Sequence, residues 1–181
     1  MNTESRKKYV LTGGPGVGKT AVIEILASKG YAIVPEVARM IMEEEQIKNS
    51  DVLPWKNLAK FQEAVAKRQL AAETEIKADI VFLDRGIIDG YAYCIQGNIP
   101  APSMLLKNAE NRYDKVFLLA PLPEYENDSI RKEKKNFQTA IHGMIKEAYE
   151  KFGYELIHVP VLAPHERVEF IISGIRKKPL H

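Results

Sequence analysis

The stretch that decides the fold is Gly13-Gly14-Pro15-Gly16-Val17-Gly18-Lys19-Thr20. It matches the pattern G-x-x-x-x-G-K-[ST], the P-loop, at every fixed position. A short apolar run, Tyr9-Val10-Leu11, precedes it, and a helix-like segment from Thr20 to Lys29 follows. Because strand, loop and helix in this order form the context in which the pattern works, the alternative of a glycine-rich turn that binds nothing is disfavoured.

These residue types predict a binding site for the phosphate chain of a nucleotide. Glycines let backbone N–H groups turn inward around phosphate oxygens, and the next helix adds unpaired N–H groups and the positive end of its dipole. We expect Lys19 to reach the β- and γ-phosphates and the Thr20 hydroxyl to hold Mg²⁺. ATP or GTP with Mg²⁺ is therefore the expected cofactor, and the sequence leaves the choice of nucleotide open.

Composition sets the outer bounds on the class of protein. The length of 181 residues predicts a single domain, residues 1–181, and 45% hydrophobic residues suffice for a sizeable core. A net charge of +2 gives no argument for nucleic acid or a membrane surface. Cys94 is the only cysteine, which excludes an intrachain disulfide and fits a reducing cytoplasm. No apolar run approaches the ~18 residues of a membrane span. Oligomeric state stays open.

Five short apolar runs alternate with helix-like segments. We expect strands at residues 8–12, 31–34, 79–84, 115–120 and 154–159, and helices at 20–29, from 37 onward, and at 55–78, 103–110, 136–152 and 164–176. Residues 87–96 are expected to form either a short helix or a helical loop. Helical periodicity puts Trp55 and Phe137 on buried faces of their helices. The alternation predicts an α/β fold with an open, parallel, doubly wound sheet. Ligands bind such sheets beyond the carboxyl ends of the strands, so residues there carry the functional argument.

Asp84 ends the third apolar run, as a Walker-B carboxylate does. Such a carboxylate holds Mg²⁺ directly or through water, and the alternative is a helix or turn cap. The next residue is Arg85, where motors of the AAA class place a glutamate that activates water. No Asn-Lys-x-Asp element for reading guanine occurs. These features argue against an AAA motor and against a switch GTPase of the Ras kind.

Other polar side chains are expected around the same cleft. Glu36 follows the second strand, where it can accept a proton from an attacking hydroxyl or hydrogen-bond a sugar. Arg39 is expected to bind an anionic substrate group, or to form a structural pair with Glu36. Gln62 is either a reader of a ring edge or a helix-surface residue. Asp89 is a further candidate to line the pocket. The four histidines form no metal or triad pattern, and Cys94 is assigned to packing.

The segment 121–135 after the fourth strand is charged and is expected to be mobile. In a phosphoryl-transfer enzyme such a segment closes on the phosphates, and we assign that role to Arg131. Lys132, Lys134 and Lys135 are better explained as a solvated charge run.

Several blocks together resemble a known family. They are Gly13–Thr20, Val34–Arg39, Phe82–Asp89, Tyr113–Leu119 and Gly153–Pro160. In this order and spacing, residues 8 to 175 resemble small P-loop proteins described as AAA-type ATPase domains or kinase-like NTPases. That family is similar to the nicotinamide-riboside kinase domain and, more distantly, to deoxynucleoside and thymidylate kinases. The P-loop is generic, whereas the Pro-Glu-x-Ala-Arg and Asp-Arg-Gly-x-x-Asp blocks are specific.

The resemblance implies a three-layer α/β/α sandwich with strand order 2-3-1-4-5 and a lid after the fourth strand. It implies that Asp84 and Glu36 are metal-organising or base carboxylates and that Arg85 and Arg131 bind phosphate. It also implies that Gln62 belongs to a Phe-Gln pair that reads a base. The family's motifs do not fix its substrate, and Lys134 and Lys135 stand where a second lid arginine would be expected.

Two hypotheses from different classes follow. The first is an enzyme that transfers phosphate from Mg²⁺-ATP to a small hydroxyl-bearing acceptor, with a nucleoside-like metabolite favoured. The second is a nucleotide-dependent binding or regulatory module with slow ATP or GTP hydrolysis. For the enzyme, the expected catalytic residues are Lys19, Glu36, Asp84, Arg85 and Arg131, and the expected acceptor-binding residues are Glu36, Arg39, Gln62, Arg85 and Asp89.

Overall fold

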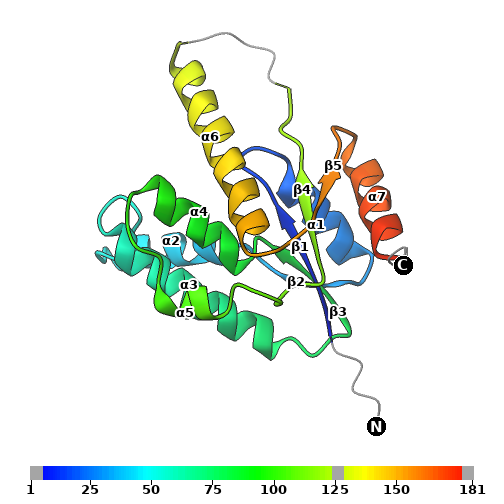
Figure 1. Cartoon of the computed structure of the whole chain (residues 1–181), viewed down its shortest axis with the longest axis horizontal. Helices are drawn as coiled ribbons and strands as arrows, with labels where there is room; N and C mark the ends of the chain where they lie inside the picture. Colours follow the sequence, from blue (N-terminus) through cyan, green and yellow to red (C-terminus); the bar gives the residue numbers. More distant parts are fainter. Residues whose placement is uncertain (1–5, 124–128, 177–181) are drawn as a thin grey trace.

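The fold is described by a computed structural model that covers residues 6–123 and 129–176, with only the backbone described at 129–135. Within these residues, five parallel strands form one sheet (Figure 1). They are β1 (Lys7–Thr12), β2 (Ala32–Val34), β3 (Ile80–Asp84), β4 (Lys115–Leu119) and β5 (Leu156–Val159). Their order, β2-β3-β1-β4-β5, confirms the predicted α/β fold and its kinase-type strand order.

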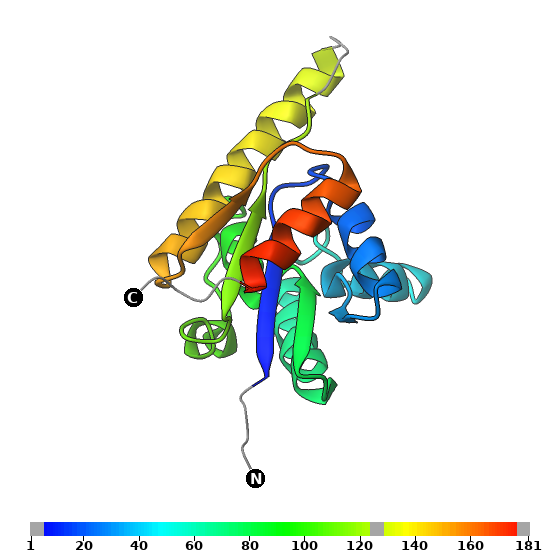
Figure 2. The ribbon, with the colours of Figure 1, turned by 90° about the vertical axis from the view of Figure 1, so that its right-hand side faces the viewer.

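Helices cover both faces of the sheet. The described helices are α1 (Lys19–Ser28), α2 (Val37–Ile47), α3 (Leu58–Glu75), α4 (Ile87–Gln96), α5 (Ser103–Lys107), α6 (Ser129–Lys151) and α7 (Pro164–Arg176). Helices α1 and α7 pack on the face turned toward the viewer in Figure 2, and α2 to α6 contribute to the core on the other face. None of the described helices is long and apolar enough to cross a membrane.

Strand side chains divide between two cores because successive residues of a strand point to opposite faces. Val10, Val81 and Val116 belong to the core under α3, α4 and α6, whereas Leu11 and Phe82 belong to the core under α1 and α7. Both faces are covered, which explains why the strands read as continuous apolar runs. Leu11 pairs with Asp84 on one side and with Phe117 on the other. The segments that follow β1, β3 and β4 therefore leave the sheet at one edge.

The prediction that Trp55 lies on a buried helix face is wrong. Helix α3 begins at Leu58, and the Asn57 side chain caps it by accepting a hydrogen bond from the Lys60 N–H at 3.1 Å. Trp55 therefore lies in the preceding turn, where it is 63% exposed. Residues before the N-cap do not belong to the helix, so helical periodicity cannot assign Trp55 to a face of α3.

The start of α6 also differs from the expectation. The helix begins at Ser129, so residues 129–135 have helical backbone instead of forming a loop, and Phe137 is 43% exposed. The cause is visible in Figure 1, where the first turns of α6 extend past the sheet. Ile141 and Ile145, one and two turns later, are fully buried. The Arg131 side chain and residues 1–5, 124–128 and 177–181 lie outside the described part of the protein.

Candidate functional site

The P-loop connects β1 to α1 at the carboxyl edge of the sheet. Its backbone enters the left-handed region at Gly16 (φ 77°) and at Gly18 (φ 85°), which is the residue that caps α1. Only glycine adopts these angles without steric cost. The first N–H groups of a helix have no intrahelical partner, so the start of α1 after this turn suits the binding of an anion.

Lys19 is a buried cation without a carboxylate partner among the described residues. It is 6% exposed, and its Nζ lies 3.4 Å from the Gly13 carbonyl oxygen and 3.3 Å from that of Gly14. Burial, with a contribution from Arg85, lowers the Lys19 pKa to about 8, while Asp84 and Asp89 act in the opposite direction. A bound anion would favour the charged form of this lysine, so the site suits phosphate.

Asp84 carries an orphaned oxygen at the end of β3. It is 6% exposed, and its Oδ1 is buried without a hydrogen-bond partner in the part of the chain that is described. Burial raises the Asp84 pKa to about 6, against the opposing effect of Lys19. An unsatisfied buried carboxylate oxygen is costly, and a cation would satisfy it.

The donor set around Asp84 fits Mg²⁺. Magnesium needs only one or two carboxylates when substrate phosphates and water supply the remaining ligands. Asp84 and the exposed Thr20 at the start of α1 meet that requirement. The described residues contain no cluster of three or more His, Cys, Asp or Glu able to hold a metal, so they offer no all-protein cage.

Asp84→Asn should weaken ATP binding more in Mg²⁺ than in EDTA, because the amide is a poorer metal ligand. It should also raise the melting temperature of the ligand-free protein at pH 7.5. The folded pKa of about 6 exceeds the ordinary 3.8, so ionisation above pH 6 costs folding free energy, and the gain should vanish near pH 4. Calorimetry and thermal melting measure both effects.

Asp79→Asn, at an exposed position just before β3, is the matched control and should change neither quantity. Equal losses of ATP affinity in Mg²⁺ and in EDTA would mean that Asp84 is not a metal ligand.

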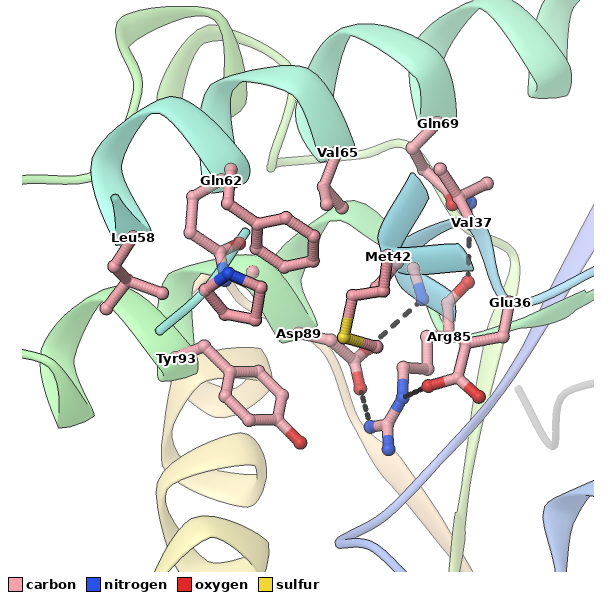
Figure 3. Close-up of a pocket in the computed structure, with 15 residues that line it drawn as sticks. Glu36, Val37, Met42, Leu58, Gln62, Val65, Gln69, Arg85, Asp89 and Tyr93 are labelled. Atoms are coloured by element: carbon pink, nitrogen blue, oxygen red, sulfur yellow. Dashed lines mark hydrogen bonds and ion pairs between the residues drawn. The ribbon is translucent and has the colours of Figure 1, made fainter. Parts of the chain in front are cut away.

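Arg85 joins the ends of three strands. Its Nε donates to Glu36 Oε1 at 2.9 Å and its Nη1 to Asp89 Oδ1 at 3.0 Å (Figure 3). Nη1 also donates to the Gly13 carbonyl at 3.0 Å. Burial works against its charge, but Asp89, Tyr93 and Glu36 raise its pKa above the ordinary value. Arg85 therefore stays a cation that links the P-loop to the strand ends.

The backbone of Arg85 is strained. Its φ of 71° lies in the left-handed region, which is uncommon for a residue with a side chain. The Arg85 N–H donates to the Leu11 carbonyl at 3.0 Å, and the Gln69 amide donates to the Arg85 carbonyl at 3.3 Å. Strain that surroundings maintain in this way is typical of functional sites.

Asp89 lines the pocket, but its oxygens already have partners. Oδ1 accepts from the Thr12 hydroxyl at 2.6 Å and from Arg85, and Oδ2 accepts from the Tyr149 hydroxyl at 2.6 Å and from the Gly86 N–H at 3.1 Å. Asp89 is 3% exposed. Asp89 therefore orients the Arg85 side chain, and its contact with a ligand stays a prediction.

Glu36 is the N-cap residue of α2 and pairs with Arg85 more closely than with Arg39. The Arg39 Nε lies 3.9 Å from Glu36 Oε2, and the Arg39 side chain is 61% exposed. Burial raises the Glu36 pKa, but the charge and hydrogen bond of Arg85, together with Lys19, bring it below the ordinary value. Glu36 is therefore ionised at neutral pH and acts as a hydrogen-bond acceptor. Arg39 does not line the cavity described next.

A cavity of about 160 Å³ lies among α2, α3 and α4. It adjoins the Arg85 cluster, which consists of Arg85, Glu36 and Asp89. Its polar end is formed by Glu36, Arg85 and Asp89 (Figure 3). Its walls are largely apolar and include Met42, Leu58, Phe61, Val65 and Tyr93. An apolar cavity with a few convergent polar groups is the usual form of a small-molecule site.

Gln62 lies in this cavity, so the helix-surface interpretation of Gln62 is wrong. The residue is 4% exposed, and the described residues give its carboxamide no hydrogen bond. Gly90 faces it, because a Cβ at position 90 would stand 3.1 Å from Gln62 Oε1. The carboxamide is thus free to pair with a ligand.

His142 is a site residue that the sequence did not reveal. Its Nδ1 accepts a hydrogen bond from the Gly14 N–H at 3.1 Å. Burial, Lys19 and His158 lower the His142 pKa, which keeps the imidazole neutral and able to accept. The contact joins α6 to a loop 128 residues earlier in the chain, and no local pattern marks such a pairing.

Comparison with known proteins agrees with this geometry. Residues 8–167 match the family model described as an AAA domain. No curated protein matches the chain. Among solved structures, the NadR protein in complex with NR is similar at a TM-score of 0.69 and 20% identity over 97% of this chain. This chain spans only about half of NadR, 54% of its length.

Two further solved structures align with this chain over almost the whole length of both proteins. Deoxyadenosine kinase from M. mycoides, with dCMP and dCDP bound, has a TM-score of 0.59 and 17% identity, covering 93% of this chain and 98% of that one. Shikimate kinase from Acinetobacter baumannii, in complex with shikimate, has a TM-score of 0.54 and 16% identity, covering 98% and 97%. At these identities the likeness shows a P-loop fold that resembles small-molecule kinases.

Proposed function

The chain belongs to the AAA domain family, and we propose that it is a Mg²⁺-dependent phosphotransferase. It transfers the γ-phosphoryl group of ATP to a hydroxyl of a small, nucleoside-like molecule. The observation that carries this proposal is the position of Arg85. One guanidinium bonds both a P-loop carbonyl and the carboxylates at the polar end of a largely apolar cavity, so the proposed donor and acceptor sites adjoin there.

The donor site is the P-loop. Lys19 pairs with the β- and γ-phosphates, and Thr20 and Asp84 hold Mg²⁺. The metal neutralises charge that develops on the phosphate oxygens. Hydrolysis of ATP is disfavoured in this proposal, because Arg85 occupies the position at which an AAA motor has a glutamate that activates water. The nearby carboxylate of Glu36 is hydrogen-bonded to Arg85.

The acceptor site is the cavity. Gln62 offers one donor and one acceptor side to a planar ring between apolar walls, and Glu36 and Arg85 face the acceptor hydroxyl. Because the transition state of phosphoryl transfer is loose, positioning matters more than base strength. An ionised Glu36 of low pKa therefore suffices to orient the hydroxyl and to take its proton late. Arg131 closes over the transferring phosphate in this proposal, and Arg39 contacts anionic parts of the acceptor at the rim.

The molecules bound in the similar structures support a small-molecule acceptor. They are NR in NadR, dCMP and dCDP in the deoxyadenosine kinase, and shikimate in the shikimate kinase. Two of the three proteins are named for phosphate transfer to a small hydroxyl-bearing molecule.

The test is transfer of label from [γ-³²P]ATP, with Mg²⁺, into a panel of nucleosides and a small-molecule extract. We expect a labelled phosphoester that requires Mg²⁺ and is absent with Lys19→Ala. Parallel reactions with labelled GTP identify the preferred donor. Label found only in inorganic phosphate would contradict the kinase proposal and favour a slowly hydrolysing regulatory module.

A further inference from the structure

Arg167 is a buried arginine that contacts the P-loop from behind. It lies near the start of α7 and is 2% exposed. Its guanidinium donates to three backbone carbonyls, those of Val17 at 2.5 Å, Ala120 at 3.0 Å and Pro160 at 3.0 Å. Val17 belongs to the P-loop, while Ala120 and Pro160 directly follow β4 and β5. One side chain thus ties the loop to the ends of two strands.

Among the described residues, this cation has no acidic partner. No carboxylate of the described residues forms an ion pair with Arg167, so carbonyl dipoles alone stabilise its charge. Burial lowers the Arg167 pKa below the ordinary value for arginine. The guanidinium nevertheless stays charged at neutral pH, because arginine is not deprotonated in proteins. A buried charge without a counter-charge is expensive for a fold to keep. It is therefore a candidate for a role beyond packing.

The position of the guanidinium suits such a role. Its Nη1 would stand 3.5 Å from a Cβ placed on Gly18, the residue that caps α1. Figure 2 shows the first turn of α7 close to the connection between β1 and α1. The bond to the Val17 carbonyl fixes the peptide unit that joins Val17 to Gly18. The N–H of that unit is one of the donors that the P-loop offers to phosphate.

We propose that Arg167 is a positioning residue for nucleotide binding. It holds the Val17–Gly18 peptide in the binding conformation before the nucleotide arrives, and it places an uncompensated positive charge behind the phosphate cradle. It does not touch the nucleotide, since its side chain is covered. The inference rests on the proposed nucleotide site and adds to it a residue from the far end of the chain.

Arg167→Met tests the proposal, because methionine keeps much of the volume and loses the charge and the donors. We expect the fraction of molecules with a binding-competent loop to fall to about one tenth. The dissociation constant for Mg²⁺-ATP should then rise about tenfold. Amide hydrogen exchange of the peptide that contains residues 13–20 should accelerate in the ligand-free protein. Arg167→Lys keeps the charge but not the three-way bonding, so it should recover part of the ATP affinity and little of the exchange protection.

Val168→Ala is the control for lost stability, since Val168 is a fully buried neighbour on the same helix. It should lower the melting temperature while ATP affinity, measured well below melting, stays unchanged. The proposal is overturned if Arg167→Met behaves like Val168→Ala, with normal ATP affinity and normal exchange at residues 13–20. If Arg167→Met does not fold, the same two readouts on Arg167→Lys decide.

Failure of the proposed function would look different. If the unmodified protein binds no ATP, the donor site itself is wrong. The exchange comparison in ligand-free protein still tests whether Arg167 holds the loop.

Discussion

Lys19→Ala should abolish measurable ATP binding at micromolar concentrations while the fold stays intact. The lysine is a buried cation whose hydrogen-bond partners in the described part of the chain are the Gly13 and Gly14 carbonyls, and the phosphate chain is its expected partner. Truncating one member of a buried charge pair costs about 2–5 kcal/mol, which corresponds to a loss of affinity between roughly 30-fold and 4,000-fold. Isothermal calorimetry with Mg²⁺-ATP measures it.

The melting temperature of Lys19→Ala should stay the same or rise. The folded pKa of about 8 lies below the ordinary 10.5, so protonated Lys19 costs folding free energy at neutral pH, and that cost declines as the pH rises through 8. Lys67→Ala, at an exposed position on α3, removes the same charge away from the cleft and should leave ATP binding unchanged. Unaltered affinity in Lys19→Ala would refute the P-loop assignment.

Glu36→Gln should lower turnover by roughly 10²–10⁴-fold, the range typical when a catalytic base is lost. The amide keeps the shape of the side chain and a hydrogen bond from Arg85, but it cannot take the proton of the acceptor hydroxyl. ATP affinity should change little, because Glu36 lies on the acceptor side of the Arg85 cluster. Steady-state kinetics with the acceptor found by the labelling experiment, together with ATP calorimetry, give both quantities.

Glu44→Gln is a matched control on the same helix. Glu44 accepts two hydrogen bonds from Arg68, at 2.5 and 2.8 Å, and does not line the cavity. Its loss therefore reports the cost of breaking a carboxylate–arginine pair that has no part in the chemistry. If Glu36→Gln lowers only the melting temperature, as this control is expected to do, then Glu36 is a structural partner of Arg85.

Several features of the molecule were predictable from local sequence. The P-loop pattern fixes a strand, a turn and a helix because its glycines require particular backbone angles. Helix α7 has the predicted bounds, since its periodic pattern ends at clear breaks. Residues 87–96, for which the sequence left a short helix or a helical loop open, form helix α4. Asp84 was predicted to end a buried strand and does so. Its orphaned oxygen agrees with the metal role that the sequence suggests, a role that stays a prediction.

Other features depend on contacts between distant segments. The sequence indicated that Glu36 and Arg85 follow neighbouring strands, but not that Arg85 would bond Glu36, Gly13 and Asp89 at once. In that arrangement the Arg85 backbone is left-handed, its N–H donates to the Leu11 carbonyl, and its carbonyl accepts from the Gln69 amide. The cavity around Gln62 likewise exists only where three helices meet.

The sequence by itself determined the strand order by resemblance, the place of the phosphate cradle and the residue types beside it. Each of these depends on short patterns, whose backbone preferences and periodicities act over a few residues. Only the tertiary structure decided that His142 bonds the Gly14 N–H and that Arg167 bonds the Val17 carbonyl. The bonded residues are 128 and 150 positions apart in the sequence. The bonds exist because the fold brings α6 and α7 next to the P-loop, which no local pattern encodes.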